Sequence, residues 1–271
     1  MSDAVARFSG SMPDYYERYM VPMLFAPHAR IAAARLGDMR SGRVLELAAG
    51  TGAMTRASAA VLPDAVAIVA TDLNQPMLDR ATPHTGSARV RWQQADALAL
   101  PFGDREFDAV VCQFGVMFYP DKPAGFAETF RVLKPGGRFI FSVWDVMERN
   151  VLNQICYDTV SALFPADPPR GFLGPFSHLD PTTIASDLAG VGFEAVDIET
   201  MSEKSRAASA RDAALGPCKG SSTGNESDAR SPGCLDRATD AVAAAIAARF
   251  GTGPIEAPNQ ALLVRARRPA V

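Results

Sequence analysis

The stretch Val44-Leu45-Glu46-Leu47-Ala48-Ala49-Gly50-Thr51-Gly52 decides the fold of this 271-residue chain. An apolar strand runs into an acidic residue, and the chain then turns on small residues into an Ala-rich helix. Because side chains are nearly absent at this turn, a ligand can approach bare backbone N–H groups at a helix N-terminus. A second acid, Asp72, ends the next apolar run, where it could hold a ribose. The stretch therefore predicts a nucleotide-type binding loop.

Strands and helices alternate on either side of this turn. Asn74 is a candidate helix cap, and Lys134-Pro135-Gly136-Gly137 reads as a stop signal, with Lys134 marking a turn. This alternation predicts an α/β fold, with a parallel sheet covered by helices on both faces. We expect strands over 44–48, 65–71, 90–94, 107–112 and 138–144, and helices over 51–61, 76–81 and 123–133.

Residues 1–40 are expected to form a helical N-terminal arm. Ser11 resembles a helix cap, Tyr15, Tyr16 and Tyr19 lie on the helix that follows, and Pro22 is expected to interrupt it. A second helix is expected to begin near Pro27 and to end at Gly37.

Residues 146–271 are expected to hold a partly helical lid and the last two strands, after a core over 41–145. The whole chain, 1–271, is then one domain. The patterns predict helices over 152–163, 181–190, 207–215 and 235–250, strands over 193–200 and 261–267, and a polar loop over 217–233.

Composition narrows the classes of function. The net charge is −3 and no dense Lys/Arg block exists, so nucleic acid is not an expected partner. No run approaches the roughly 18 apolar residues of a membrane span. The four cysteines fall in no close-spaced pair and the chain starts without an apolar signal segment. We therefore expect a cytoplasmic protein with reduced thiols and no metal site.

Glu46 favours a cationic ligand over a dinucleotide. A carboxylate immediately before the turn would repel a phosphate and attract an ammonium or sulfonium group. The third glycine of the dinucleotide fingerprint is also missing, because the pattern from Ala48 runs Ala-x-Gly-x-x-Ala. A cationic nucleoside is therefore the expected ligand.

Five segments in order resemble the motifs of class I S-adenosylmethionine-dependent methyltransferases, in particular small-molecule enzymes that include the ubiquinone/menaquinone-type subgroup. The segments are 44–52, 71–78, 94–102, 107–118 and 133–138. The resemblance implies a Rossmann-like, seven-stranded, mostly parallel sheet with an antiparallel last strand. It also implies S-adenosyl-L-methionine as cofactor and methyl transfer by in-line displacement, driven by proximity and alignment.

The resemblance assigns the cofactor's amino-acid end to Glu46 and to the backbone of Ala48 and Gly50, and both ribose hydroxyls to Asp72. Ala48 stands where the family usually has its first glycine. We expect the extra methyl group to narrow the approach to the cofactor and to affect affinity rather than function.

The adenine is assigned to four further residues. Leu73 and Met77 would lie against the ring, Asp96 would accept from its amino group, and Ala97 would bind the ring edge through its backbone N–H.

The resemblance places Gln113 and Phe114 beside the sulfonium and folds Tyr19 over the cofactor. The segment Gln113-Phe114-Gly115 differs from the Asn/Asp-Pro-Pro-aromatic signature of amino-methylating nucleic-acid enzymes, which favours a small-molecule acceptor. Phe118 and Tyr119 fit either the core or the floor of the pocket. Asp108 is expected to be structural.

No catalytic base is assigned, because each of the three histidines reads as a loop or arm residue. The residues leave two alternatives open. One is a nicotinamide-dependent oxidoreductase on a similar fold, and the other is a non-catalytic module that binds S-adenosylmethionine. The acceptor, the receiving atom and the oligomeric state are not determined by the sequence.

Overall fold

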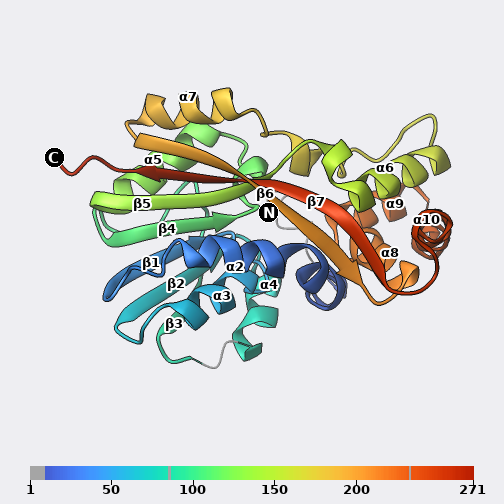
Figure 1. Cartoon of the computed structure of the whole chain (residues 1–271), viewed down its shortest axis with the longest axis horizontal. Helices are drawn as coiled ribbons and strands as arrows, with labels where there is room; N and C mark the ends of the chain where they lie inside the picture. Colours follow the sequence, from blue (N-terminus) through green and yellow to red (C-terminus); the bar gives the residue numbers. More distant parts are fainter. Residues whose placement is uncertain (1–9, 85–86, 232) are drawn as a thin grey trace. The chain divides into compact units, whose positions relative to one another are not determined.

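A seven-stranded sheet in the order β3-β2-β1-β4-β5-β7-β6 carries the fold (Figure 1). The computed structural model describes residues 10–84, 87–231 and 233–271. The parallel strands β1 to β5 and the antiparallel pairing of β7 with β5 confirm the predicted sheet. The strands are β1 (Gly42–Leu47), β2 (Val66–Asp72), β3 (Val90–Gln94), β4 (Phe107–Gln113), β5 (Leu133–Trp144), β6 (Glu194–Ala207) and β7 (Ile255–Arg267).

The first strand is apolar because it lies in the middle of a sheet that is covered on both faces. Val44, Leu45 and Leu47 are fully buried. A parallel strand buried on both faces reads as a continuous apolar run rather than as an alternation. β1 pairs with β2 on one side and with β4 on the other, so the turn after β1 opens at the centre of one sheet edge.

Helices flank the sheet on both sides, as predicted (Figure 1). Asp180 caps the N-terminus of α7 (Pro181–Val191), because its carboxylate accepts from the backbone N–H groups of Thr182 and Thr183. On one side lie α2 (Ala26–Ala34), α3 (Ala53–Val61) and α4 (Gln75–Ala81), and on the other lie α5 (Lys122–Val132) and α7 (Pro181–Val191).

The prediction that Pro22 interrupts the first helix is wrong. α1 (Met12–Tyr15) continues into a π-helix, η2 (Tyr16–Phe25), which contains Pro22 and leads directly into α2. Ala26 N–H reaches back five residues to Val21 O, so the helix continues past Pro22 in π-type turns. Ser11 precedes the helix but makes no side-chain cap. The prediction for residues 1–9 lies outside the described residues.

β5 begins at Leu133, earlier than the predicted start at Arg138, and this changes the role of Lys134. Instead of marking a turn, Lys134 lies in the strand, and its Nζ donates to both carboxylate oxygens of Asp108 at 2.8 and 2.9 Å. Asp108 Oδ2 also accepts from Arg43 N at 2.8 Å. Asp108 therefore joins three strands, which agrees with its expected structural role.

The predicted polar loop over 217–233 contains a helix, so that prediction is wrong. α9 (Ser222–Arg230) follows α8 (Ala210–Lys219), which itself passes Pro217. The helix has no apolar stripe in its sequence, but Thr223 and Ser227 are buried against its neighbours. β6 continues beyond its predicted end at 200, and β7 begins before its predicted start at 261. The other helices of this part are α6 (Val151–Leu163) and α10 (Cys234–Phe250).

The chain forms two compact units. The first comprises Met1–Pro27, Asp145–Phe176 and Ser202–Gln260, and the second comprises His28–Trp144, Ser177–Met201 and Ala261–Val271. The second unit contains β1 to β5 and the helices beside them. No helix within the described ranges has the length and apolar content needed to cross a membrane.

Candidate functional site

Ten of the eleven predicted site residues lie in the second unit, at or just beyond the carboxyl ends of β1, β2, β3 and β4. These four strands are neighbours in the sheet, in the order β3-β2-β1-β4. The chain moves to one side of β1 for β2 and β3 and to the other side for β4, so the order reverses beside β1. Open α/β sheets bind ligands beyond the carboxyl ends of strands at such a reversal.

The turn after β1 uses the left-handed backbone region three times. Ala48, Gly50 and Gly52 have φ angles of 51°, 56° and 88°. Glycine adopts this conformation freely, whereas Ala48 carries the steric cost of its Cβ. A Cβ built on Gly115 would come within 2.5 Å of Ala48 Cβ and 2.7 Å of Cys112 Sγ. The methyl group of Ala48 therefore requires glycine at position 115.

Asp72 joins the two loops at this edge. Its Oδ2 accepts from Gly50 N at 2.8 Å, and its Oδ1 accepts from Asn74 N at 2.8 Å and from Asn74 Nδ2 at 3.2 Å. Burial raises the pKa of Asp72, while these N–H donors oppose the rise. Asn74 occupies the cap position of α4 as predicted, but its side chain binds Asp72 and makes no cap.

Glu46 is not the simple anion that the sequence argument assumed. Its side chain belongs to β1 and is 1% exposed. Burial raises its pKa to about 8, against the lowering effects of neighbouring Thr55 and Arg56, so the carboxyl group holds its proton at neutral pH. Glu46 Oε2, Thr51 Oγ1 and Asn74 Oδ1 are buried and lack hydrogen-bond partners among the described residues.

The residues assigned to the adenine follow β2 and β3. Met77 is buried in α4, Leu73 and Ala97 are half-buried, and Asp96 is exposed. Asp96 Oδ1 accepts from Leu98 N at 2.9 Å, which fixes the carboxylate at the start of the next loop.

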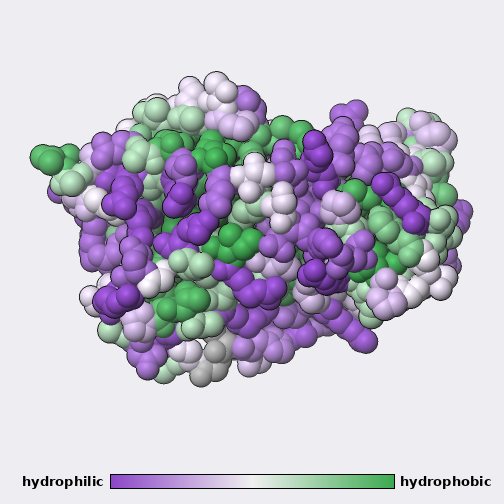
Figure 2. Space-filling view, in the orientation of Figure 1, coloured by the Kyte–Doolittle hydropathy of each residue, from purple (hydrophilic) through white to green (hydrophobic). Residues whose placement is uncertain are grey.

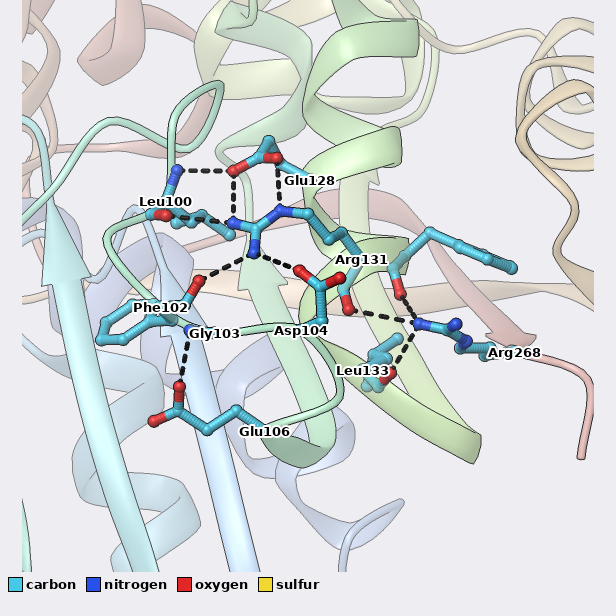
Figure 3. A network of polar contacts seen from close by, with 10 residues as sticks. Leu100, Phe102, Gly103, Asp104, Glu106, Glu128, Arg131, Leu133 and Arg268 are labelled. Atoms are coloured by element: carbon cyan, nitrogen blue, oxygen red, sulfur yellow. Dashed lines mark hydrogen bonds and ion pairs between the residues drawn. The ribbon is translucent and has the colours of Figure 1, made fainter.

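A clamp that the sequence argument missed holds the loop after Asp96 (Figure 3). Arg131 on α5 donates to Leu100 O at 3.0 Å, to Phe102 O at 2.8 Å and to Asp104 Oδ1 at 2.9 Å. Two further N–H groups of Arg131 bind Glu128, whose Oε2 also accepts from Leu100 N at 2.7 Å. Arginine has five N–H donors, and Arg131 makes five hydrogen bonds within this network. The clamp joins the Asp96 segment to a rigid helix.

Gln113 ends β4, and Phe114 follows it with a φ of 54°. The Phe114 ring stacks on Trp144 with centroids 3.8 Å apart, and His28 meets both rings edge-on at 5.6 Å. His28 is fully buried. Sequence reasoning placed it only in the N-terminal arm, because its partners lie far away in the sequence.

Tyr119 and Phe118 differ in environment. Tyr119 is buried, and its hydroxyl lies 3.5 Å from Cys112 Sγ. Burial raises the pKa of Cys112 to about 12, so the thiol stays protonated. Phe118 is 52% exposed, so it does not belong to the core, and its alternative place at the floor of the pocket stays a prediction.

Tyr19 lies in the first unit, where its ring stacks on Tyr15 with centroids 5.9 Å apart. Its assignment to the cofactor stays a prediction. The part of the chain that the structure describes contains no group of three His, Cys, Asp or Glu residues placed to hold a metal ion.

The chain is similar to known proteins both in sequence and in structure. Residues 44–137 match a family described as "Methyltransferase domain". A ubiquinone/menaquinone biosynthesis C-methyltransferase of Azotobacter vinelandii is 32% identical over 180 residues, which cover 61% of this chain and 71% of that protein. A demethylmenaquinone methyltransferase of Deinococcus radiodurans is 41% identical over 113 residues, covering 41% and 46%.

Solved structures share the fold. A putative methyltransferase of Bacillus halodurans has a TM-score of 0.56 at 19% identity, and the match covers 89% of this chain and 98% of that one. Phosphoethanolamine N-methyltransferase 2 of Haemonchus contortus, solved with S-adenosyl-L-methionine, has a TM-score of 0.60 at 16% identity, covering 95% and 56%.

Proposed function

Because the chain belongs to the class I S-adenosylmethionine-dependent methyltransferase family, of the ubiquinone/menaquinone type, we propose that the edge beyond β1 to β4 is its cofactor site. The protein is an enzyme that transfers a methyl group from S-adenosylmethionine to a small-molecule acceptor. The observation that carries the assignment of the site is Asp72, whose buried carboxylate ties the two loops of this edge together.

The residues at this edge fit the cofactor. The turn carries few side-chain atoms, so a ligand can come close to its backbone. The buried partnerless oxygens of Glu46, Thr51 and Asn74 are suited to an ammonium, a hydroxyl and water. Asp72 accepts three hydrogen bonds, and a carboxylate has about four lone-pair sites, so it keeps acceptor capacity for a ribose hydroxyl.

Each residue then has a physical task. Glu46 and the backbone at Ala48 and Gly50 hold the amino-acid end, and Asp72 holds the ribose. Leu73 and Met77 enclose the adenine, whose amino group meets Asp96 and whose ring edge meets Ala97 N–H.

Near the reacting centre, Gln113 and Phe114 line the space. When bound, the cofactor supplies an electrophilic methyl group on a sulfonium. The chain contributes alignment and exclusion of water, which together can account for much of the acceleration of an in-line displacement.

We further propose that the protein has no nucleic-acid partner and a cytoplasmic location. The low net charge of −3 supports the first point, and the four cysteines, all free thiols, support the second. The names of the relatives suggest reduced naphthoquinones as the first acceptors to test, with carbon as the receiving atom.

Two measurements test the proposal. Calorimetry should detect one site for S-adenosylhomocysteine and none for NAD, and Asp72→Ala should weaken that binding at least tenfold, because it removes a charge-assisted acceptor. Binding of NAD alone would instead indicate an oxidoreductase. Turnover of S-adenosylmethionine against reduced naphthoquinones and small phenols separates an enzyme from a non-catalytic module, which would bind the cofactor without turnover.

A further inference from the structure

A pocket lies within the second unit and is lined by residues of β5, β6 and β7 and by Arg35, which follows α2. Its volume is about 280 Å³. Figure 2 shows hydrophilic and hydrophobic residues side by side over the region where β5, β6 and β7 lie in Figure 1. Four arginines and one aspartate carry the charge of the lining: Arg35, Arg138, Arg265, Arg267 and Asp197. This concentration of positive charge contrasts with the net charge of −3 of the chain.

Strand pairing forces two of these arginines together. Arg138 on β5 is directly opposite Arg267 on β7, and the next same-face pair places Arg265 opposite Ile140. Directly opposite side chains on antiparallel strands lie on one face with Cβ atoms about 5 Å apart, where like charges repel. Arg267 forms no ion pair with any described residue. The pocket thus contains a repulsion that a bound anion would relieve.

Carboxylates orient the other arginines without filling the pocket. Asp38 binds Arg138 at 2.7 Å and Glu199 binds Arg35 at 2.6 Å, and neither carboxylate lines the cavity. Arg35 Nε is buried and lacks a partner among the described residues. Half-exposed ion pairs of this kind contribute little stability, so their arginines remain available to a second anion. Asp197, paired with Arg265, is the one acid in the lining.

We propose that this pocket binds a small anion that carries phosphate groups. Guanidinium groups match phosphate oxygens in geometry and charge, and pyrophosphate is the simplest probe that can reach several of them at once. The pocket is distinct from the cofactor edge. Ala109 on β4 pairs with both Arg138 on β5 and Val44, the third of the six residues of β1, whereas the cofactor edge follows the end of β1.

Calorimetry with inorganic pyrophosphate tests the proposal. Wild-type protein should bind one pyrophosphate in low salt, more weakly in high salt because the charges are screened. Arg267→Ser should weaken binding at least about tenfold, as expected for loss of a charge-assisted contact. Asp197→Asn should strengthen it several-fold, because it removes the acid from the lining. Arg249→Ser, which removes an exposed arginine from α10 in the other unit, is the matched control and should change nothing.

The result of Asp197→Asn separates a binding site from an ion-pair network. If the arginines only support the sheet, Asp197→Asn changes stability without improving pyrophosphate binding. Absence of saturable binding at millimolar pyrophosphate, or equal losses in Arg267→Ser and Arg249→Ser, would overturn the proposal. Displacement of pyrophosphate by saturating S-adenosylhomocysteine would also overturn it, since the two sites are proposed to be separate.

A phosphate group can come from a soluble metabolite or from a lipid headgroup. Sedimentation with phosphatidylcholine vesicles, with and without phosphatidylglycerol, distinguishes the two. Sedimentation that requires phosphatidylglycerol and Arg267 would assign the pocket to a lipid headgroup. Pyrophosphate binding without sedimentation would assign it to a soluble phosphorylated molecule.

Discussion

Ionisation of Glu46 should accompany cofactor binding. Its pKa is about 8, so about 0.9 of the molecules hold this proton at pH 7. An ammonium group bound next to a carboxyl lowers its pKa by about 1–3 units. With a drop of about two units, binding of S-adenosylhomocysteine releases about 0.8 proton at pH 7 and about 0.1 at pH 9. The dissociation constant should correspondingly fall about eightfold between pH 7 and 8.5.

Calorimetry in buffers with different ionisation enthalpies measures the released proton directly. Glu46→Gln is the control, because it keeps the shape of the side chain and cannot ionise. The variant should release no proton, and its dissociation constant should not follow the pH profile of the wild type. Release below about 0.2 proton at pH 7, or equal release by Glu46→Gln, would refute the assignment of Glu46 to the cofactor's cationic end.

The same carboxyl group predicts a stability profile in the protein without cofactor. Above pH 4.5 the unfolded chain loses this proton, whereas the folded protein keeps it until about pH 8. The unfolded state therefore binds fewer protons, and the free energy of unfolding falls as pH rises, by about 1.4 kcal/mol per pH unit from this group. Chemical denaturation of wild type and Glu46→Gln between pH 5.5 and 7.5 should show this difference in slope. Parallel profiles would mean that Glu46 is ionised when buried.

Three other perturbations follow from the structure. Ala48→Gly should stabilise the fold by about 0.5–1 kcal/mol, because relief of left-handed strain exceeds the added chain entropy, whereas Gly115→Ala should cost about 1–3 kcal/mol. The double variant should recover part of that cost in thermal unfolding, and additive effects would contradict the contact. Gly253→Ala, whose added Cβ meets no atom and which lies outside the helices and strands, is the control. Arg131→Lys should increase hydrogen exchange over residues 96–106 and weaken cofactor binding, while Arg91→Lys should do neither. Burial lowers the pKa of His178 from 6.5, so the unfolded state takes up more protons below that pH. The free energy of unfolding of the wild type should therefore decrease as pH falls from 6.5. His178→Leu should reduce this pH dependence, and His84→Asn should not.

Local chemistry made the sheet and its cofactor edge predictable. The strand, turn and helix around Glu46 and Gly50 are encoded within nine residues, and Asp72 follows at the end of the next strand. The carboxyl ends of parallel strands meet at one edge, so knowing the strands is enough to bring these residues together. The helix over 222–230 was missed because its stability comes from packing of small polar residues, which leaves no periodic apolar signal.

Long-range packing explains the features that sequence reasoning could not reach. The sequence places His28 only in the N-terminal arm, yet it is fully buried and meets Phe114 and Trp144 edge-on. Arg131 acts on a loop about thirty residues earlier, and its role depends on the way α5 crosses that loop. The charge of Glu46 is also a property that sequence reasoning could not predict. Its position could be read from the motif, but its charge could not, because the pKa of a carboxyl group depends on the water that folding removes from it. A proton measurement therefore tests the three-dimensional site, whereas the motif alone predicts an anion at that position.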